Sequence, residues 1–247
     1  MDEFEDSFGK RPDPKRLHHA IGLRKVSEGV FDDATLMTLY KLSRKGAFDR
    51  VTGIVSQGKE ANVYHGEGKH GEVAIKIYCV DACDFKRMGD HIIGDPRFSV
   101  GKNRRHLVYQ WVQREFRNLS EVYGKVTCPK PHAILNNVLV MEFIGENGFA
   151  APKLKDIQLS DPEEYFKKIL TNLKNMHSCN IVHGDLSEYN ILDFGKPYFI
   201  DFSMGVTLAH PNADKLLSRD VGNICKFFSK KGVNLDETKI LNEIKSS

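Results

Sequence analysis

The sequence predicts an α+β protein with two lobes, a strand-rich first half and a helix-rich second half. The prediction rests on the hydrophobic period, which is two in residues 51–78 and 133–144 and helical in residues 107–123 and 162–176. The length of 247 residues allows one large domain or two small ones. The chain is 40% hydrophobic and 28% charged, with a net charge of +3, which excludes collagen-like, disordered and disulfide-framework proteins.

The strand-rich lobe, residues 26–144, is expected to follow a charged head. Residues 1–25 contain few large apolar side chains, so we expect a mobile head there. Asp32 or Asp33 could cap the first helix, because apolar residues recur behind them at helical spacing. Three strand candidates follow: Val51–Val55, Val63–His65 and Glu72–Tyr78.

The third strand candidate places a lysine among apolar residues. Alternation along the strand directs Lys76 to the face opposite Val73, Ile75 and Ile77, so that face is not plain core. After an irregular loop, residues 81–106, a helix is predicted over Leu107–Tyr123. Glu115 lies on its inward flank, where a carboxylate needs a partner.

The chain then returns to strands and changes to helices across a short linker. Ala133–Leu135 and Val138–Ile144 are strand candidates joined by Asn136-Asn137, a dipeptide that favours hairpin turns. Residues 145–152 predict a hinge or linker. The helical lobe, residues 153–247, is expected to contain a helix that begins at Asp161 and Pro162, a good cap followed by a good first helical residue.

The segment that carries chemistry lies in the helical lobe. Asp185 and Asn190 are five residues apart in a turn, and Asp201 follows a short apolar strand, within His183-Gly184-Asp185-Leu186-Ser187-Glu188-Tyr189-Asn190 and Ile200-Asp201-Phe202. Phosphoryl transfer needs such groups, because its catalysis is mostly positioning and charge neutralisation. Asn190 and Asp201 offer the hard oxygen ligands that Mg²⁺ prefers, and Asp185 can accept a hydroxyl proton or align a water.

A glycine-containing segment between the first two strands could cover phosphates. The segment Ser56-Gln57-Gly58-Lys59-Glu60-Ala61-Asn62 matches neither the Gly-x-Gly-x-x-Gly loop of ordinary protein kinases nor a P-loop. Gly58 permits close backbone approach, and Ser56 and Lys59 are candidate phosphate donors. An ordinary hairpin turn is the alternative interpretation.

Together these motifs resemble the RIO family of atypical serine/threonine protein kinases. The resemblance covers Val26 to Phe228, and the ending Glu60-Ala61-Asn62-Val63-Tyr64 is similar to the first subfamily, which has no N-terminal winged helix. The chain departs from ordinary kinases in having Asp201-Phe202-Ser203 where they have Asp-Phe-Gly, a difference that the family shares. The short chain without long tails suggests an archaeal source.

The resemblance implies a bilobal protein-kinase-like fold that binds ATP with Mg²⁺ or Mn²⁺. It implies that Lys76 contacts phosphates and is oriented by Glu115, and that the backbone of Glu142 and Ile144 binds adenine. Asp185 would be the catalytic aspartate, Asn190 and Asp201 would bind the metal, and Asp201 could accept the phosphoryl group as an aspartyl phosphate. The implied partner is the pre-small-ribosomal-subunit particle, with its ribosomal RNA and proteins.

The length after Asp201 predicts a trimmed C-terminal lobe. Only 46 residues follow Asp201, too few for an activation segment and the peptide-docking helices of ordinary kinases. An apolar stripe allows one more packed helix there, formed by Leu217, Val221, Ile224 and Phe228.

Two other functions remain open from the sequence. One is a small-molecule phosphotransferase of the aminoglycoside or choline kinase type, which also uses His-Gly-Asp and Ile-Asp-Phe. The other is an ATP-gated assembly factor that binds ribosomal RNA and has little kinase activity. In that case the head and six basic loop residues could contact RNA phosphates, or they could form a solvated surface, since four Asp residues interleave them: Lys86, Arg87, Arg97, Lys102, Arg104 and Arg105.

The remaining expectations concern modification, location and assembly. Ser99 is a candidate autophosphorylation site. The five cysteines lack the spacing of a zinc site, so reduced thiols in a cytoplasmic protein are expected. No apolar run reaches the ~20 residues that a membrane span needs, and we expect a monomer.

Overall fold

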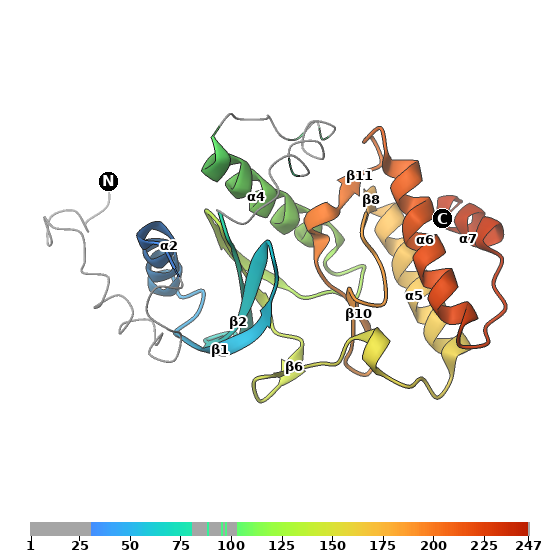
Figure 1. Ribbon diagram of the computed structural model, residues 1–247, viewed down its shortest axis with the longest axis horizontal. Helices are drawn as coiled ribbons and strands as arrows, with labels where there is room; N and C mark the ends of the chain where they lie inside the picture. The colour runs from blue at the N-terminus through green and yellow to red at the C-terminus, as the bar shows by residue number, and fades with distance from the viewer. Residues whose placement is uncertain (1–30, 81–87, 89–94, 96, 98–102, 247) are drawn as a thin grey trace, which may run out of the picture.

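The computed structural model describes residues 31–80, 88, 95, 97 and 103–246. The predicted head and Ser99 lie outside the described residues, as do Lys86, Arg87 and Lys102. Figure 1 shows a sheet with two helices on one side of the molecule and a group of helices on the other. The elements of the first half are α2 (Asp33–Arg44), β1 (Arg50–Gln57), β2 (Ala61–Gly68), β3 (Gly71–Tyr78), α4 (Arg104–Val122), β4 (Pro131–Leu135) and β5 (Val138–Glu142).

The second half contains longer helices and short strands. Helix α5 contacts α7, α7 contacts α6, and the three lie beside one another in Figure 1. The elements are β6 (Gly145–Glu146), β7 (Phe149–Ala150), the 3₁₀ helix η2 (Leu154–Asp156), α5 (Pro162–Ser178), β8 (Ile181–Val182), β9 (Ile191–Asp193), β10 (Pro197–Phe199), the 3₁₀ helix η3 (Phe202–Met204), β11 (Val206–Thr207), α6 (Ala213–Ser229) and α7 (Glu237–Lys245).

The five-stranded sheet has the order β1-β2-β3-β5-β4, with all neighbours antiparallel. Strand β3 is central, and both of its faces are buried as its alternation predicts. Val73, Ile75 and Ile77 join the core cluster that includes α2, whereas Ala74 and Tyr78 join the cluster that includes α4. Lys76 therefore lies on the face that turns toward α4 and the second half of the chain.

The helices begin where their capping residues predict. The Asp32 carboxylate accepts from the Thr35 amide at 2.8 Å, and the Asp161 carboxylate accepts from the Glu164 amide at 3.0 Å. Helix α4 starts three residues earlier than its apolar stripe predicts, because the Asn103 side chain caps it by accepting from the Arg105 amide at 2.9 Å. Arg104 and Arg105 thus belong to the helix and not to the loop.

The structure adds detail to one prediction about the second half and corrects another. The linker 145–152 contains a small hairpin, β6–β7, whose turn residues Asn147 and Gly148 both have positive φ. Asn-Gly favours such a two-residue turn, so the signal was present in the sequence. Two helices, α6 and α7, follow Asp201 instead of one. Helix α7 buries only Ile240 and Ile244, an apolar pattern too small to stand out.

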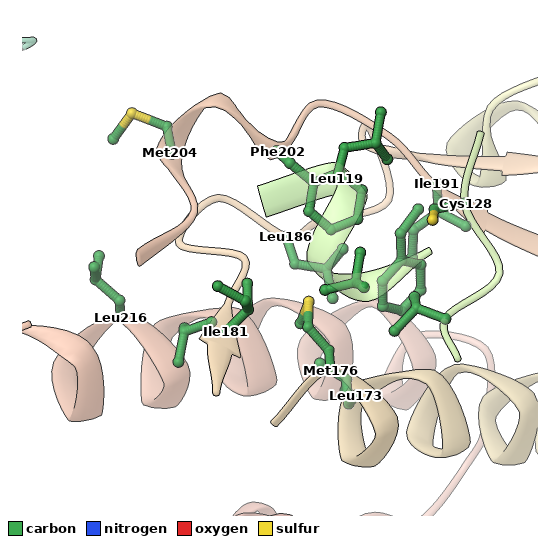
Figure 2. Packing of buried hydrophobic residues seen from close by; sticks show 14 of the residues in the cluster. Leu119, Cys128, Leu173, Met176, Ile181, Leu186, Ile191, Phe202, Met204 and Leu216 are labelled. Atoms are coloured by element: carbon green, nitrogen blue, oxygen red, sulfur yellow. The ribbon is translucent and has the colours of Figure 1, made fainter. Parts of the chain in front are cut away.

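One hydrophobic core joins the two halves. Figure 2 shows Leu119 of α4 beside Phe202 of η3, with Leu186 and the Met176 side chain of α5 on the side toward helices α5 and α6. The turn that contains Asp201 is therefore anchored to both halves. Among the described residues, no helix is long and apolar enough to span a membrane.

Candidate active site

Lys76 connects the sheet, helix α4 and the turn that follows β10. Its Nζ donates to Glu115 Oε1 at 2.8 Å and to Asp201 Oδ1 at 2.9 Å. The other oxygen of Glu115, Oε2, accepts from the Tyr78 hydroxyl at 2.5 Å. Lys76 and Glu115 have 8% and 2% of their side chains exposed, whereas Asp201 has 41%. The fold thus brings together three predicted site residues, and only the carboxylate of Asp201 is open to solvent.

Lys76 and Asp201 hold each other in their ionised forms. Burial disfavours the Lys76 cation, but the charges of Asp201 and Glu115 outweigh it and raise the pKa of Lys76 well above its usual value. Burial also raises the pKa of Asp201, yet Lys76 and the Ser203 hydroxyl, which donates at 2.6 Å, lower it below its ordinary value overall. Burial raises the pKa of Glu115. Asp201 is therefore an ionised carboxylate that can ligate a cation or act as a nucleophile.

Asp185 and Asn190 occupy the turn between β8 and β9. The Asn190 Nδ2 group donates to the Asp185 carbonyl at 2.8 Å, and it lies 3.4 Å from Asp185 Oδ2. The Ile200 amide donates to the Asn190 carbonyl at 3.0 Å, which ties this turn to the residue before Asp201. Because its amide nitrogen is used by Asp185, Asn190 has its Oδ1 atom left as a possible metal ligand.

Asp220, which the motif does not contain, anchors this turn from α6. Its two carboxylate oxygens accept from the amides of Gly184 and Leu186 at 2.7 and 2.9 Å, on either side of Asp185. Burial raises the pKa of Asp220 to about 7. Arg219 donates to the Gly184 carbonyl and lies 3.9 Å from Asp185 Oδ1. A buried Asp in the apolar stripe of α6, three residues after Leu217, was the available sequence signal.

The turn after Asp201 is held by two further residues that the motifs did not single out. The Arg114 guanidinium donates to the Gly205 carbonyl at 3.0 and 2.9 Å. Asn118 Nδ2 donates to the carbonyls of Phe202 and Gly205 at 3.1 and 2.8 Å. Asp201 itself has a left-handed φ of 64°, which Asp tolerates better than most residues. Helix α4 therefore fixes the unusual backbone conformation at Asp201.

The segment predicted to cover phosphates forms the turn between β1 and β2. The Gly58 amide donates to the Ala61 carbonyl at 3.0 Å, and a Cβ atom on Gly58 would come within 2.8 Å of that oxygen, so glycine is required there. Ser56, near the end of β1, and Lys59, in the turn, are both exposed. The described residues thus leave both side chains available for phosphate, and their role stays a prediction.

The predicted adenine-binding residues lie at the end of β5, where the chain leaves the sheet. The Ile144 carbonyl accepts from the Ala151 amide at 2.9 Å, and the Glu142 side chain accepts from the Lys130 amide at 3.0 Å. Glu142 pairs with Val73 of β3, two residues before Ile75 and three before Lys76. The backbone of this segment therefore lies beside the strand that carries Lys76.

His183 should make the stability of the protein depend on pH. Its side chain is fully buried, its Nε2 group donates to the Ile200 carbonyl at 3.0 Å, and burial lowers its pKa from 6.5 to about 4. Below pH 6.5 His183 is protonated in the unfolded chain, whereas in the folded protein it stays neutral down to about pH 4. The free energy of unfolding therefore falls as the pH falls through this window. The free energy of unfolding should decrease by about 3 kcal/mol from this group, as measured by urea unfolding.

A variant separates this effect from general acid destabilisation. His183→Gln keeps a side-chain donor for the Ile200 carbonyl but does not titrate. Its free energy of unfolding should lose less between pH 6.5 and 4 than that of the wild type. Identical pH profiles for the two proteins would show that His183 is not the responsible group.

The site contains a buried strand lysine paired with a helix glutamate, and a second carboxylate lies 2.9 Å from that lysine. A turn aspartate is followed, five residues further on, by an asparagine that bonds to it. Together these groups define a phosphotransferase site on a protein-kinase-like fold. A model of the RIO domain matches residues 62–240, more than half of the chain. The chain belongs to the RIO family. The match begins later than the predicted resemblance and extends beyond Phe228 into α7.

The similar proteins come from archaea and eukaryotes. The RIO-type serine/threonine-protein kinase Rio1 of Methanocaldococcus jannaschii is 46% identical, over 85% of this chain and 73% of its own. The protein of the same name from Haloferax volcanii is 41% identical, over 86% and 74%. The Rio2 kinase of Chaetomium thermophilum shares the fold, with a TM-score of 0.69 at 19% identity over 90% of this chain and 72% of that chain.

These relatives establish the class of enzyme. The chain is a kinase of the RIO type, and the fold is the predicted bilobal one.

Proposed function

We propose that the protein is an ATP- and Mg²⁺-dependent kinase and ATPase that acts in maturation of the small ribosomal subunit, with Asp201 as a transient phosphoryl acceptor. The observation that carries the proposal is the Asp201 carboxylate, which is ionised, 41% exposed and held 2.9 Å from Lys76. A related fold gives further support, since one structure of the Chaetomium thermophilum Rio2 kinase, 21% identical with a TM-score of 0.66, is described as an ADP/Mg²⁺-phosphoaspartate complex.

The residues of the site fit a hard divalent cation. Asp201 and Asn190 supply carboxylate and amide oxygens, and Mg²⁺ is usually bound by one or two such groups together with phosphates and water. When bound, the cation neutralises charge on the phosphates of ATP. Mn²⁺ has the same preference for oxygen and is the alternative ion.

The chain's own residues would then divide the chemistry. A carboxylate oxygen of Asp201 attacks the γ-phosphorus of ATP, the bond from that phosphorus to the β,γ-bridging oxygen breaks, and ADP leaves. Lys76 stabilises negative charge on the phosphates, and Glu115 keeps Lys76 in place. Asp185 aligns a water or a serine hydroxyl and accepts its proton when the phosphoryl group leaves Asp201.

The acceptor can be identified chemically. After incubation with labelled ATP and Mg²⁺, the wild type should carry a label that hydroxylamine removes, and borohydride should convert Asp201 to homoserine, detected by mass spectrometry. Asp201→Asn should carry no such label, whereas Asp156→Asn, a change at a carboxylate that pairs with Lys155 outside the site, should behave as the wild type. A label that resists hydroxylamine and maps only to serine would refute the aspartyl phosphate.

The ribosomal role is the finer part of the proposal. Three of the six basic loop residues lie outside the described residues, and two of the others bind carboxylates: Arg97 contacts Asp95 at 2.7 Å and Arg105 contacts Asp32 at 2.7 Å. Support for an RNA contact by these two is correspondingly weaker. Salt-sensitive co-sedimentation with pre-30S or pre-40S particles, with and without an ATP analogue, tests the role.

A further inference from the structure

The β6–β7 hairpin, which follows the predicted adenine-binding residues, is gripped by a carboxylate from the sheet. Glu72, at the start of β3, accepts from the Gly148 amide at 2.6 Å and from the Asn147 amide at 3.2 Å. Its backbone carbonyl accepts from the Phe143 amide at 3.3 Å. One residue of β3 thus holds the chain on both sides of Ile144.

His65 of β2 supports this grip. Its residue surface is only 5% exposed, its Nε2 atom lies 2.9 Å from Glu72 Oε1, and its ring packs edge-on against Phe143 with centroids 4.7 Å apart. A carboxylate only accepts, so Nε2 carries a proton, and Nδ1 makes a short contact with the Thr52 hydroxyl. Thr52 lies at a bulge of β1, which directs its side chain toward His65.

We call His65 and Glu72 the hinge clamp. The hairpin segment that they bind is itself tightly constrained. Gly145 cannot be replaced without conflict, because a Cβ atom there would lie 2.2 Å from the Phe149 carbonyl oxygen. The Ala151 amide closes the hairpin onto the Ile144 carbonyl at 2.9 Å. The hairpin therefore moves as one piece, and its position relative to β3 is set by the clamp.

We propose that His65 and Glu72 are positioning residues for the adenine end of the nucleotide, an inference that rests on the proposed binding of ATP. In the part of the chain that the structure describes they touch none of the predicted phosphate-binding side chains, and they act through the backbone of residues 143–148. Losing the clamp lets the hairpin shift relative to β3, so that the hinge backbone is no longer preorganised for a base. Binding of the base should weaken while the chemistry at Asp201 proceeds at its normal rate.

The experiment compares Glu72→Ala with Glu67→Ala. Glu67 is the cross-strand neighbour of Glu72, and in the described contacts its side chain bonds only to the exposed Arg50, which makes it a matched control. Glu72→Ala should raise the Kd for adenosine and the KM for ATP by about tenfold, with kcat changed less than twofold. Glu67→Ala should match the wild type. Glu72→Gln keeps the oxygen that accepts from Gly148 and His65 and should recover most of the affinity.

Adenosine distinguishes the clamp from the phosphate site, because it lacks phosphates. Lys76→Met should weaken ATP binding and leave adenosine binding unchanged. A purely structural loss would instead weaken the binding of both ligands. Equal adenosine affinity in Glu72→Ala, Glu67→Ala and the wild type would overturn the inference, as would a fall in kcat that matches the rise in KM. If instead the wild type itself turns over no ATP, the proposed function is refuted, and the Kd for adenosine in the variants still tests the role of the hinge clamp.

Discussion

Lys76→Met should lower kcat/KM for ATP by about 10²–10³-fold, the usual cost of removing one preorganised charge from a transition state. Lys76 is the cation that both Glu115 and Asp201 bind, at 2.8 and 2.9 Å. Methionine keeps the length and the apolar stem of the side chain but supplies no charge. Steady-state measurement of ADP release at saturating Mg²⁺ gives the ratio directly.

Loss of activity through unfolding is separated by a second substitution. In Lys76→Met the 2%-exposed Glu115 carboxylate loses its cation, and the free energy of unfolding should fall by up to about 3 kcal/mol. Lys76→Met with Glu115→Gln removes the unpaired charge, so it should regain stability and no activity. Lys69→Met, on the exposed turn between β2 and β3, is the control. Turnover near the wild-type rate in Lys76→Met would contradict the assignment of the site.

Asp220→Ala should cost about 2–4 kcal/mol of unfolding free energy and lower kcat about 10- to 100-fold. The two oxygens of Asp220 hold the Gly184 and Leu186 amides, so their loss frees the backbone on both sides of Asp185. Asp220→Asn should rescue little, because one amide would then face an NH₂ group in place of an acceptor. Urea unfolding and turnover well below the melting temperature measure the two effects.

The matched control on the same helix is Asp214→Ala. The Asp214 side chain is 85% exposed and bonds to Lys245 at 2.6 Å, so stability and turnover should stay close to the wild type. Binding of ADP should also survive in Asp220→Ala, since Lys76 and Asp201 lie elsewhere in the site. If Asp220→Ala kept full turnover, the turn around Asp185 would have to be rigid without α6.

Much of the fold could be predicted because its signals are local. Alternation on β3 placed Lys76 on the face opposite Val73, and Asp161 with Pro162 marked the start of α5. The sequence predicts only a linker where the β6–β7 hairpin forms, because two residues per strand are too few to show alternation. Helix α7 was missed for a related reason, since it buries few residues of its own.

The residues of the candidate site divide in the same way, into those with a local signal in the sequence and those without one. Lys76, Asp185, Asn190 and Asp201 could be named from motif spacing, because phosphoryl transfer demands particular groups in a particular order. Glu115 could be inferred from a carboxylate on an inward helical flank. Asp220 and Arg114 belong to no motif, and the groups that they bind in the turns around Asp185 and Asp201 are backbone amides and carbonyls, which carry no residue identity for a sequence pattern to record.

By itself the sequence determined the order of the strand-rich and helix-rich halves, the strand that carries Lys76 and the four residues proposed to do the chemistry, because propensity, period and motif spacing act over a few residues. Only the tertiary structure decided that Lys76 binds Glu115 and Asp201 at once, across 39 and 125 positions of chain. It also decided that the carboxylates of Asp220 and Glu72 hold distant backbone. Such contacts follow from how the elements pack. Packing brings together residues that are far apart in the sequence, and their separation along the chain does not determine their distance in space.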